Sequence, residues 1–119
     1  MVVTVNNTRD HCLWLYTMDE WEKVELKIVA LPSFNPDHQK LKRFLLGHAS
    51  DVDMDNSGRI LLPAPLRDFA MMSKEVFLIG QGNKFEIWSE PLWNAKRAHW
   101  LDEDLDLDKI SIEMEQLSL

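Results

Sequence analysis

Cysteine occurs once in the 119 residues, at Cys12, so the chain cannot form an internal disulfide. A single thiol agrees with a reducing compartment. No apolar run approaches the roughly 18–20 residues that a membrane span requires. Residues 1–5 have neither the charged start nor the long apolar core of a secretory leader. These absences exclude membrane-spanning and disulfide-rich classes, and we expect a cytoplasmic protein with no membrane partner.

Catalytic motifs are also missing from the sequence. It contains no glycine-rich phosphate loop, no Ser-His-Asp arrangement and no paired catalytic carboxylates. His11 and Cys12 are neighbours in an expected strand, so their side chains should point to opposite faces and make a poor nucleophile and base. His38, His48 and His99 lack the spacing of a metal site. We therefore expect no enzyme activity, no cofactor, no metal and no small-molecule substrate.

The net charge of −7 is unevenly distributed. Residues 101–119 carry seven carboxylates against one lysine, which leaves the first hundred residues close to neutral. Between residues 38 and 50 there are three basic residues and no acidic one: Lys40, Lys42 and Arg43. The acidic total therefore does not exclude a nucleic-acid partner. For residues 105–119, acidic and weakly periodic, we expect a mobile or loosely docked tail.

The length of the chain predicts a single folding unit. Its apolar periodicity predicts three hairpins and four helices. Hairpins are expected over residues 1–16, over residues 51–62 with Val52 and Met54 on one face, and over residues 76–88. Thr17, with Glu20 three residues later, should begin a helix that ends before Pro32. Asn35 and Pro36 should begin a second helix that stops at Gly47. A short helix follows Pro63, and a last one begins near residue 89.

An internal repeat relates the two ends of this pattern. Residues 85–93 match residues 13–21 at an offset of 72: a strand, a hydroxyl helix cap, then tryptophan. The first strands of the two repeats, residues 2–5 and 76–79, align at an offset of 74. The second repeat is preceded by the hairpin and short helix of residues 49–75, so the first repeat is expected to be incomplete. The predicted fold class is α+β, with a first repeat and its helices over 1–47, a second repeat over 48–100 and a tail over 101–119.

The middle hairpin imitates a calcium loop. Asp53, Asp55 and Ser57 place oxygens at the spacing of an EF-hand, and Gly58 occupies its sixth position. The twelfth position is Ala64, where calcium needs a bidentate glutamate. Turn chemistry therefore explains these residues better than calcium binding.

Arg59 lies beside that turn, four residues after Asp55. Across a tight hairpin these positions face each other, so the carboxylate could hold the guanidinium while its fork points to a base edge or phosphate. An ordinary cross-strand salt bridge is the commoner explanation of the spacing alone. Both explanations stay open at this point.

Residues 55–63, with Leu66 and Arg67, resemble the MraZ family of bacterial transcriptional regulators, which is related to the AbrB and MazE swapped-hairpin DNA-binding domains. Residues 45–50, 84–88 and 116–119 also resemble it. The resemblance implies a double-split β-barrel of two repeats, each with an Asp-x-x-x-Arg hairpin, that assembles into rings. It also implies binding to direct repeats upstream of the division and cell-wall gene cluster.

Carried to this sequence, the resemblance makes Arg59 the expected DNA contact, with Asp55, Asn56 and Ser57 in the same hairpin. It implies a nucleoid-associated repressor whose partners are double-stranded promoter DNA and further copies of itself, with the amino-terminal hairpin of the first repeat absent. The alternative is an antitoxin-like protein-interaction or oligomerisation module without DNA binding, which would bind other chains by strand addition.

Overall fold

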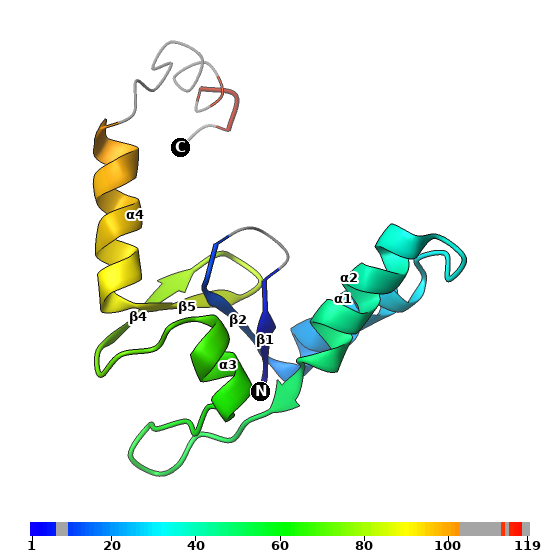
Figure 1. Cartoon of the computed structure of the whole chain (residues 1–119), viewed down its shortest axis with the longest axis horizontal. Coiled ribbons are helices and arrows are strands. Elements are labelled where there is room, and N and C mark those ends of the chain that lie inside the picture. The colour runs from blue at the N-terminus through cyan, green and yellow to red at the C-terminus, as the bar shows by residue number, and fades with distance from the viewer. Residues whose placement is uncertain (7–9, 103–112, 114, 118–119) are drawn as a thin grey trace.

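The computed structural model describes residues 1–6, 10–102, 113 and 115–117, and most of the expected acidic tail lies outside them. The elements are β1 (Val2–Val5), β2 (Leu13–Tyr16), α1 (Met18–Val29), α2 (Pro36–Gly47), β3 (Ser50–Asp51), α3 (Ala64–Phe69), β4 (Val76–Gly80), β5 (Phe85–Ser89) and α4 (Glu90–Asp102) (Figure 1). The α+β class is confirmed. Within the described ranges, no helix has the length and apolar character to cross a bilayer.

The strands form one open antiparallel sheet in the order β3-β1-β2-β5-β4. The first and third predicted hairpins are confirmed as β1-β2 and β4-β5, and each is followed by a helix. Strands β2 and β5 pair at the centre, so the two hairpins form one continuous sheet. The barrel implied by the family resemblance stays a prediction.

The pairing of β2 with β5 has an approximate twofold symmetry that matches the sequence repeat. Trp14 pairs with Glu86, its own counterpart 72 residues later, while Leu13 pairs with Ile87 and Leu15 with Phe85. The same symmetry relates two aromatic contacts between strand and helix. Tyr16 packs on Trp21 with ring centroids 5.6 Å apart, and the equivalent Trp88 packs on Trp93 at 5.7 Å. Helices α1 and α4 therefore follow their strands in equivalent positions.

The outer strands β1 and β4 are related by an offset of 75, so the predicted offset of 74 is wrong by one residue. Val2 pairs with Tyr16, and Phe77 pairs with the equivalent Trp88, which makes Phe77 the counterpart of Val2. Because a one-residue shift moves every side chain to the other face, the correction decides which residues face the core. Val3 and Leu78 are thereby equivalent.

Side-chain caps fix where the first two helices begin, as predicted. The Thr17 hydroxyl accepts a hydrogen bond from the Glu20 amide at 3.3 Å. Asn35 Oδ1 accepts from the amides of Asp37 and His38 at 2.9 and 3.3 Å. Each cap satisfies amides that have no partner within the first helical turn.

The second predicted hairpin is largely wrong. Ser50–Asp51 alone forms a strand, paired with β1, and residues 59–62 belong to no strand. A single bridge joins Met54 to Ile60. Val52 is buried while Met54 is 55% exposed, so of this expected apolar pair only Val52 packs into the core. The physical reason is that a two-stranded hairpin with no further strand beside it is marginal in water.

Candidate nucleic-acid interface

The loop of residues 52–62 carries the four predicted site residues and leaves the sheet after β3, in a different direction from α1 and α2 (Figure 1). Its tip is a tight turn. The Asp55 amide donates to the Arg59 carbonyl at 2.8 Å, and the Gly58 amide donates to the Asp55 carbonyl at 3.0 Å. Gly58 has a φ of +78°, a conformation that glycine adopts without the steric cost of a side chain.

Both carboxylate oxygens of Asp55 are used inside this turn. Oδ1 accepts from the backbone amides of Ser57 at 2.9 Å and Arg59 at 2.8 Å. Oδ2 accepts a hydrogen bond from Arg59 Nε at 2.9 Å, and this contact is also an ion pair. The amide of Arg59, then that of Ser57, and the Arg59 side chain lower the pKa of Asp55 below its ordinary value. The carboxylate is therefore charged at neutral pH, and it stabilises the turn.

Arg59 is held by Nε alone. Its side chain is 78% exposed, and its two Nη groups have no hydrogen-bond partner among the described residues. The predicted salt bridge is thus present, and it leaves the outer edge of the guanidinium available to a ligand. Asn56 and Ser57 are exposed beside it. The four predicted residues lie together at one protruding tip, and their contact with DNA stays a prediction.

The same geometry argues against calcium at this loop. Asp55 would have to give up amide donors and the arginine to coordinate a cation. Ala64, at the twelfth position, begins α3 and offers no carboxylate. Within the described residues, no three His, Cys, Asp or Glu side chains are close enough to hold a metal ion.

The three basic residues of the stretch 38–50 lie on α2, away from the tip of the loop of residues 52–62 (Figure 1). Lys40 and Arg43 are exposed, and Lys42 Nζ donates to the Ser33 hydroxyl at 3.2 Å. Asp51 and Asp53, both exposed, lie closer to Arg59 along the chain than any of these bases. Among the described residues, exposed carboxylates therefore lie along the chain between the bases of α2 and Arg59.

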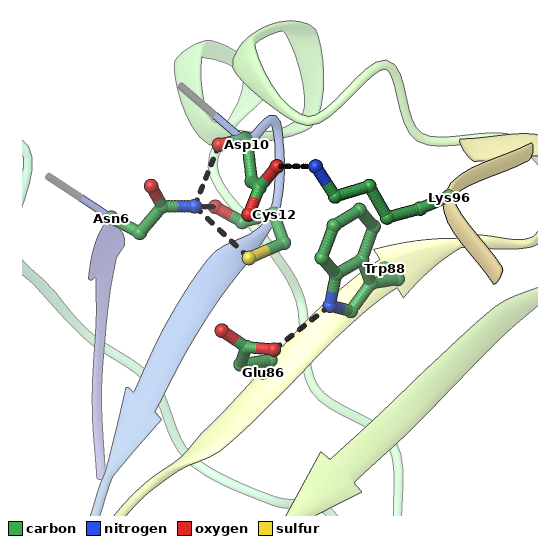
Figure 2. Close-up of polar contacts among 6 residues, drawn as sticks. All are labelled: Asn6, Asp10, Cys12, Glu86, Trp88 and Lys96. Carbon is green, nitrogen blue, oxygen red and sulfur yellow. Dashed lines mark hydrogen bonds and ion pairs between the residues drawn. The ribbon is translucent and has the colours of Figure 1, made fainter. Parts of the chain in front are cut away.

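Cys12 lies in a buried polar cluster that the sequence did not predict (Figure 2). Asn6 Nδ2 donates to the carbonyls of Asp10 and Cys12 at 2.7 and 2.9 Å and to Cys12 Sγ at 3.0 Å. Asp10 also pairs with Lys96 of α4 at 2.8 Å, so the cluster links the β1-β2 connection to α4. Burial, then the nearby Glu86 carboxylate, raises the pKa of Cys12 to about 12, so it remains a thiol at neutral pH.

His11 and Cys12 point to different environments, as expected. The His11 side chain is exposed and its Nδ1 lies 2.9 Å from the Phe69 carbonyl, while Cys12 is fully buried. His48 Nδ1 is likewise 2.7 Å from a backbone carbonyl, that of Phe44. These contacts give His11 and His48 a structural explanation.

Comparison with known proteins identifies the family. A family model described as "MraZ protein, putative antitoxin-like" matches residues 45–109, more than half of the chain. The "Transcriptional regulator MraZ" of Halorhodospira halophila is 48% identical over 119 residues, which cover 99% of this chain and 78% of the relative. The proteins of the same name from Legionella pneumophila (strain Corby) and Coxiella burnetii (strain Dugway 5J108-111) are 46% and 43% identical over all of this chain and 78% of their own length. The chain therefore belongs to the MraZ family.

Proposed function

We propose that the chain is a sequence-specific DNA-binding transcriptional regulator, a repressor of the bacterial division and cell-wall gene cluster that recognises promoter direct repeats. Its relatives are named transcriptional regulators, which supports a regulatory and non-catalytic role. In this proposal it acts as a homo-oligomer, with a ring as the form implied by the family. Promoter binding would place it in the cytoplasm, at the nucleoid.

One observation carries the proposal: Asp55 fixes Arg59 through Nε and leaves both Nη groups exposed at a protruding tip. A guanidinium held in one pose loses little side-chain entropy when it binds. Its free edge has the geometry to donate two hydrogen bonds to guanine O6 and N7 in the major groove. We assign base recognition to Arg59 and its orientation to Asp55, with Asn56 and Ser57 beside it as further DNA contacts.

The test compares wild type with Arg59→Ala on duplex DNA carrying the promoter direct repeats and on the same duplex with the repeats scrambled. A lost bidentate contact costs about 1–3 kcal/mol, so we expect roughly tenfold to hundredfold weaker binding to the repeats. Binding to scrambled DNA should weaken only by the small factor that the loss of one positive charge causes. Arg59→Lys keeps the charge but not the fork, and it should also lose sequence preference.

Arg97→Ala is the matched control, because Arg97 is an exposed arginine on α4. It removes one positive charge and should weaken binding to both duplexes by the same small factor. The proposal is overturned if Arg59→Ala and Arg97→Ala act alike, or if the wild type does not distinguish the two duplexes.

The alternative function, a protein-interaction module without DNA binding, is favoured by a different observation. Three exposed carboxylates, Asp51, Asp53 and Asp55, lie on the segment that carries Arg59, and they would repel phosphates. In this alternative the chain binds another protein by strand addition. Wild-type protein that binds neither duplex would favour it.

A further inference from the structure

A single backbone bridge determines which side chains of the loop of residues 52–62 lie together. It joins Met54 to Ile60. The residues on either side of the bridge therefore lie opposite one another in two pairs: Asp53 with Leu61, and Asp55 with Arg59. Side chains alternate between the two faces of an extended antiparallel pair, so these four lie on one face. Asp53 consequently shares the face that presents Arg59.

The same four residues line a groove. Its volume is about 360 Å³, and its lining residues are Asp53, Asp55, Arg59, Ile60 and Leu61. Leu61 is 84% exposed, and its side chain, like that of Ile60, has no hydrogen-bonding atom. The side chains of the groove therefore offer three charged groups to a ligand, one guanidinium and two carboxylates.

The two carboxylates of the groove differ in what they already bind. Asp55 accepts two backbone amides and Arg59 Nε, so its oxygens are used within the turn. Asp53 is exposed, and among the described residues its carboxylate has no hydrogen-bond or ion-pair partner. The acceptors of Asp53 are therefore free beside the free Nη donors of Arg59.

A free acceptor and a free donor on one face match different bases. In the major groove guanine presents the acceptors O6 and N7, whereas cytosine presents its N4 amino group as a donor. The outer edge of Arg59 suits guanine, and the carboxylate of Asp53 suits cytosine. Thymine presents only the acceptor O4 and a methyl group, so a carboxylate gains no hydrogen bond from it.

The spacing of the two side chains also suits neighbouring base pairs. Asp53 lies opposite Leu61, two residues beyond Arg59, so Asp53 and Arg59 are diagonal neighbours across the loop. Diagonal neighbours in an antiparallel pair are about 7–8 Å apart. Successive base pairs are roughly 3.4 Å apart, so this separation corresponds to about two base-pair steps.

We propose that Asp53 is a specificity-determining residue: its carboxylate accepts a hydrogen bond from cytosine N4 within about two base pairs of the guanine bound by Arg59. This inference rests on the proposed function, because it requires the loop to enter the major groove. It also gives Asp53 a role in selecting DNA. Where the cytosine is missing, the carboxylate stays unpaired next to the phosphates and weakens binding.

The experiment measures the affinity of wild type and Asp53→Asn for a series of promoter duplexes. In each duplex one G·C pair of the direct repeat is replaced, so that its cytosine becomes thymine. We expect wild type to lose roughly tenfold to hundredfold at the pair that Asp53 reads. Asp53→Asn should show no loss at that pair, because an amide can accept from cytosine or donate to thymine.

Two further variants separate the carboxylate from the other properties of the side chain. Asp53→Ala has no acceptor, so it should also bind the cytosine and thymine duplexes equally. Asp53→Glu keeps the carboxylate and should keep the preference for cytosine. Both Asp53→Asn and Asp53→Ala should bind the scrambled duplex more tightly than wild type does, because one negative charge near the phosphates is removed.

Asp51→Asn is the matched control. Asp51 is an exposed carboxylate on the same segment, but it belongs to β3 and is not among the residues that line the groove. The substitution removes the same charge, so it should raise affinity for all duplexes by one small factor and keep every base preference of wild type. Circular dichroism establishes that each variant compared is folded.

The outcomes distinguish this inference from the proposed function. The inference is overturned if Asp53→Asn or Asp53→Ala keeps every base preference of wild type, as Asp51→Asn should. The proposed function survives that result if wild type prefers the repeats and Arg59→Ala loses the preference. A wild type that binds the repeats and the scrambled duplex equally would overturn both.

Discussion

At the residue scale, Asp55 determines the shape of the candidate site. One carboxylate accepts two backbone amides and the Nε of Arg59, so the turn and the arginine are fixed by the same group. A change in its protonation therefore alters the site directly. The side chain of Arg59 makes no comparable contribution to the core, since most of its surface is exposed.

The lowered pKa of Asp55 predicts how the turn responds to acid. The folded pKa is below the ordinary value of 3.8, so the contribution of the carboxylate to stability is complete above that pH. It is lost as the pH falls through the lowered folded pKa. We expect the amide resonances of Ser57 and Arg59 to shift with a midpoint below 3.8 in an NMR titration.

Asp55→Asn is the control for that titration. Asparagine keeps an oxygen that can accept both amides, but it does not titrate and does not pair with Arg59 as an ion. The two amide shifts should then be independent of pH in the acid range. A wild-type midpoint at or above the ordinary aspartate pKa would contradict the hydrogen bonding described for Asp55.

At the element scale, α1 and α4 begin with equivalent hydroxyl caps. The Thr17 hydroxyl accepts from the Glu20 amide at 3.3 Å, and the Ser89 hydroxyl accepts from the Leu92 amide at 3.4 Å. We expect Thr17→Ala to lower the free energy of unfolding by about 0.5–2 kcal/mol, measured by urea denaturation. Thr17→Ser keeps the acceptor and should differ little from wild type. Equal losses in both variants would show that the hydroxyl does not cap the helix.

The equivalent tryptophans of these helices should differ in their effect on stability. Trp21 is buried against Tyr16, whereas Trp93 is half-buried between Trp88 and Trp100. Trp21→Ala should cost about 3–5 kcal/mol, because it leaves a cavity in the core. Trp93→Ala removes less buried surface and should cost about 1–2 kcal/mol. Thermal or urea unfolding of the two variants measures how much free energy of unfolding each one loses. Equal losses would contradict this prediction.

At the scale of the whole molecule, charge separates the two proposed functions. If the chain neutralises phosphates, the logarithm of its DNA affinity should fall linearly with the logarithm of salt concentration, steeply between about 50 and 200 mM. Binding to another protein by strand addition should be nearly indifferent to salt, because backbone hydrogen bonds carry it. Fluorescence anisotropy at several salt concentrations gives the slope. A slope near zero on promoter DNA would contradict phosphate contacts.

The sequence by itself determined the elements that depend on local chemistry. The Thr17 and Asn35 caps, Pro36 at the first turn of α2 and the alternating apolar residues of the outer hairpins all act within a few residues. The Asp55, Gly58 and Arg59 turn belongs to the same class, since its hydrogen bonds span four residues. Such features form wherever the local chain allows, so a pattern in the sequence suffices to predict them.

Only the tertiary structure decided how these pieces pair. The same alternating pattern predicted a strand over residues 59–62, yet β1 binds only Ser50–Asp51 and leaves the loop with one bridge. The one-residue correction between β1 and β4 likewise depended on which residues pair across the sheet. Register and edges are set by contacts between residues far apart in the chain. For that reason the register that relates β1 to β4 could not be predicted from the sequence.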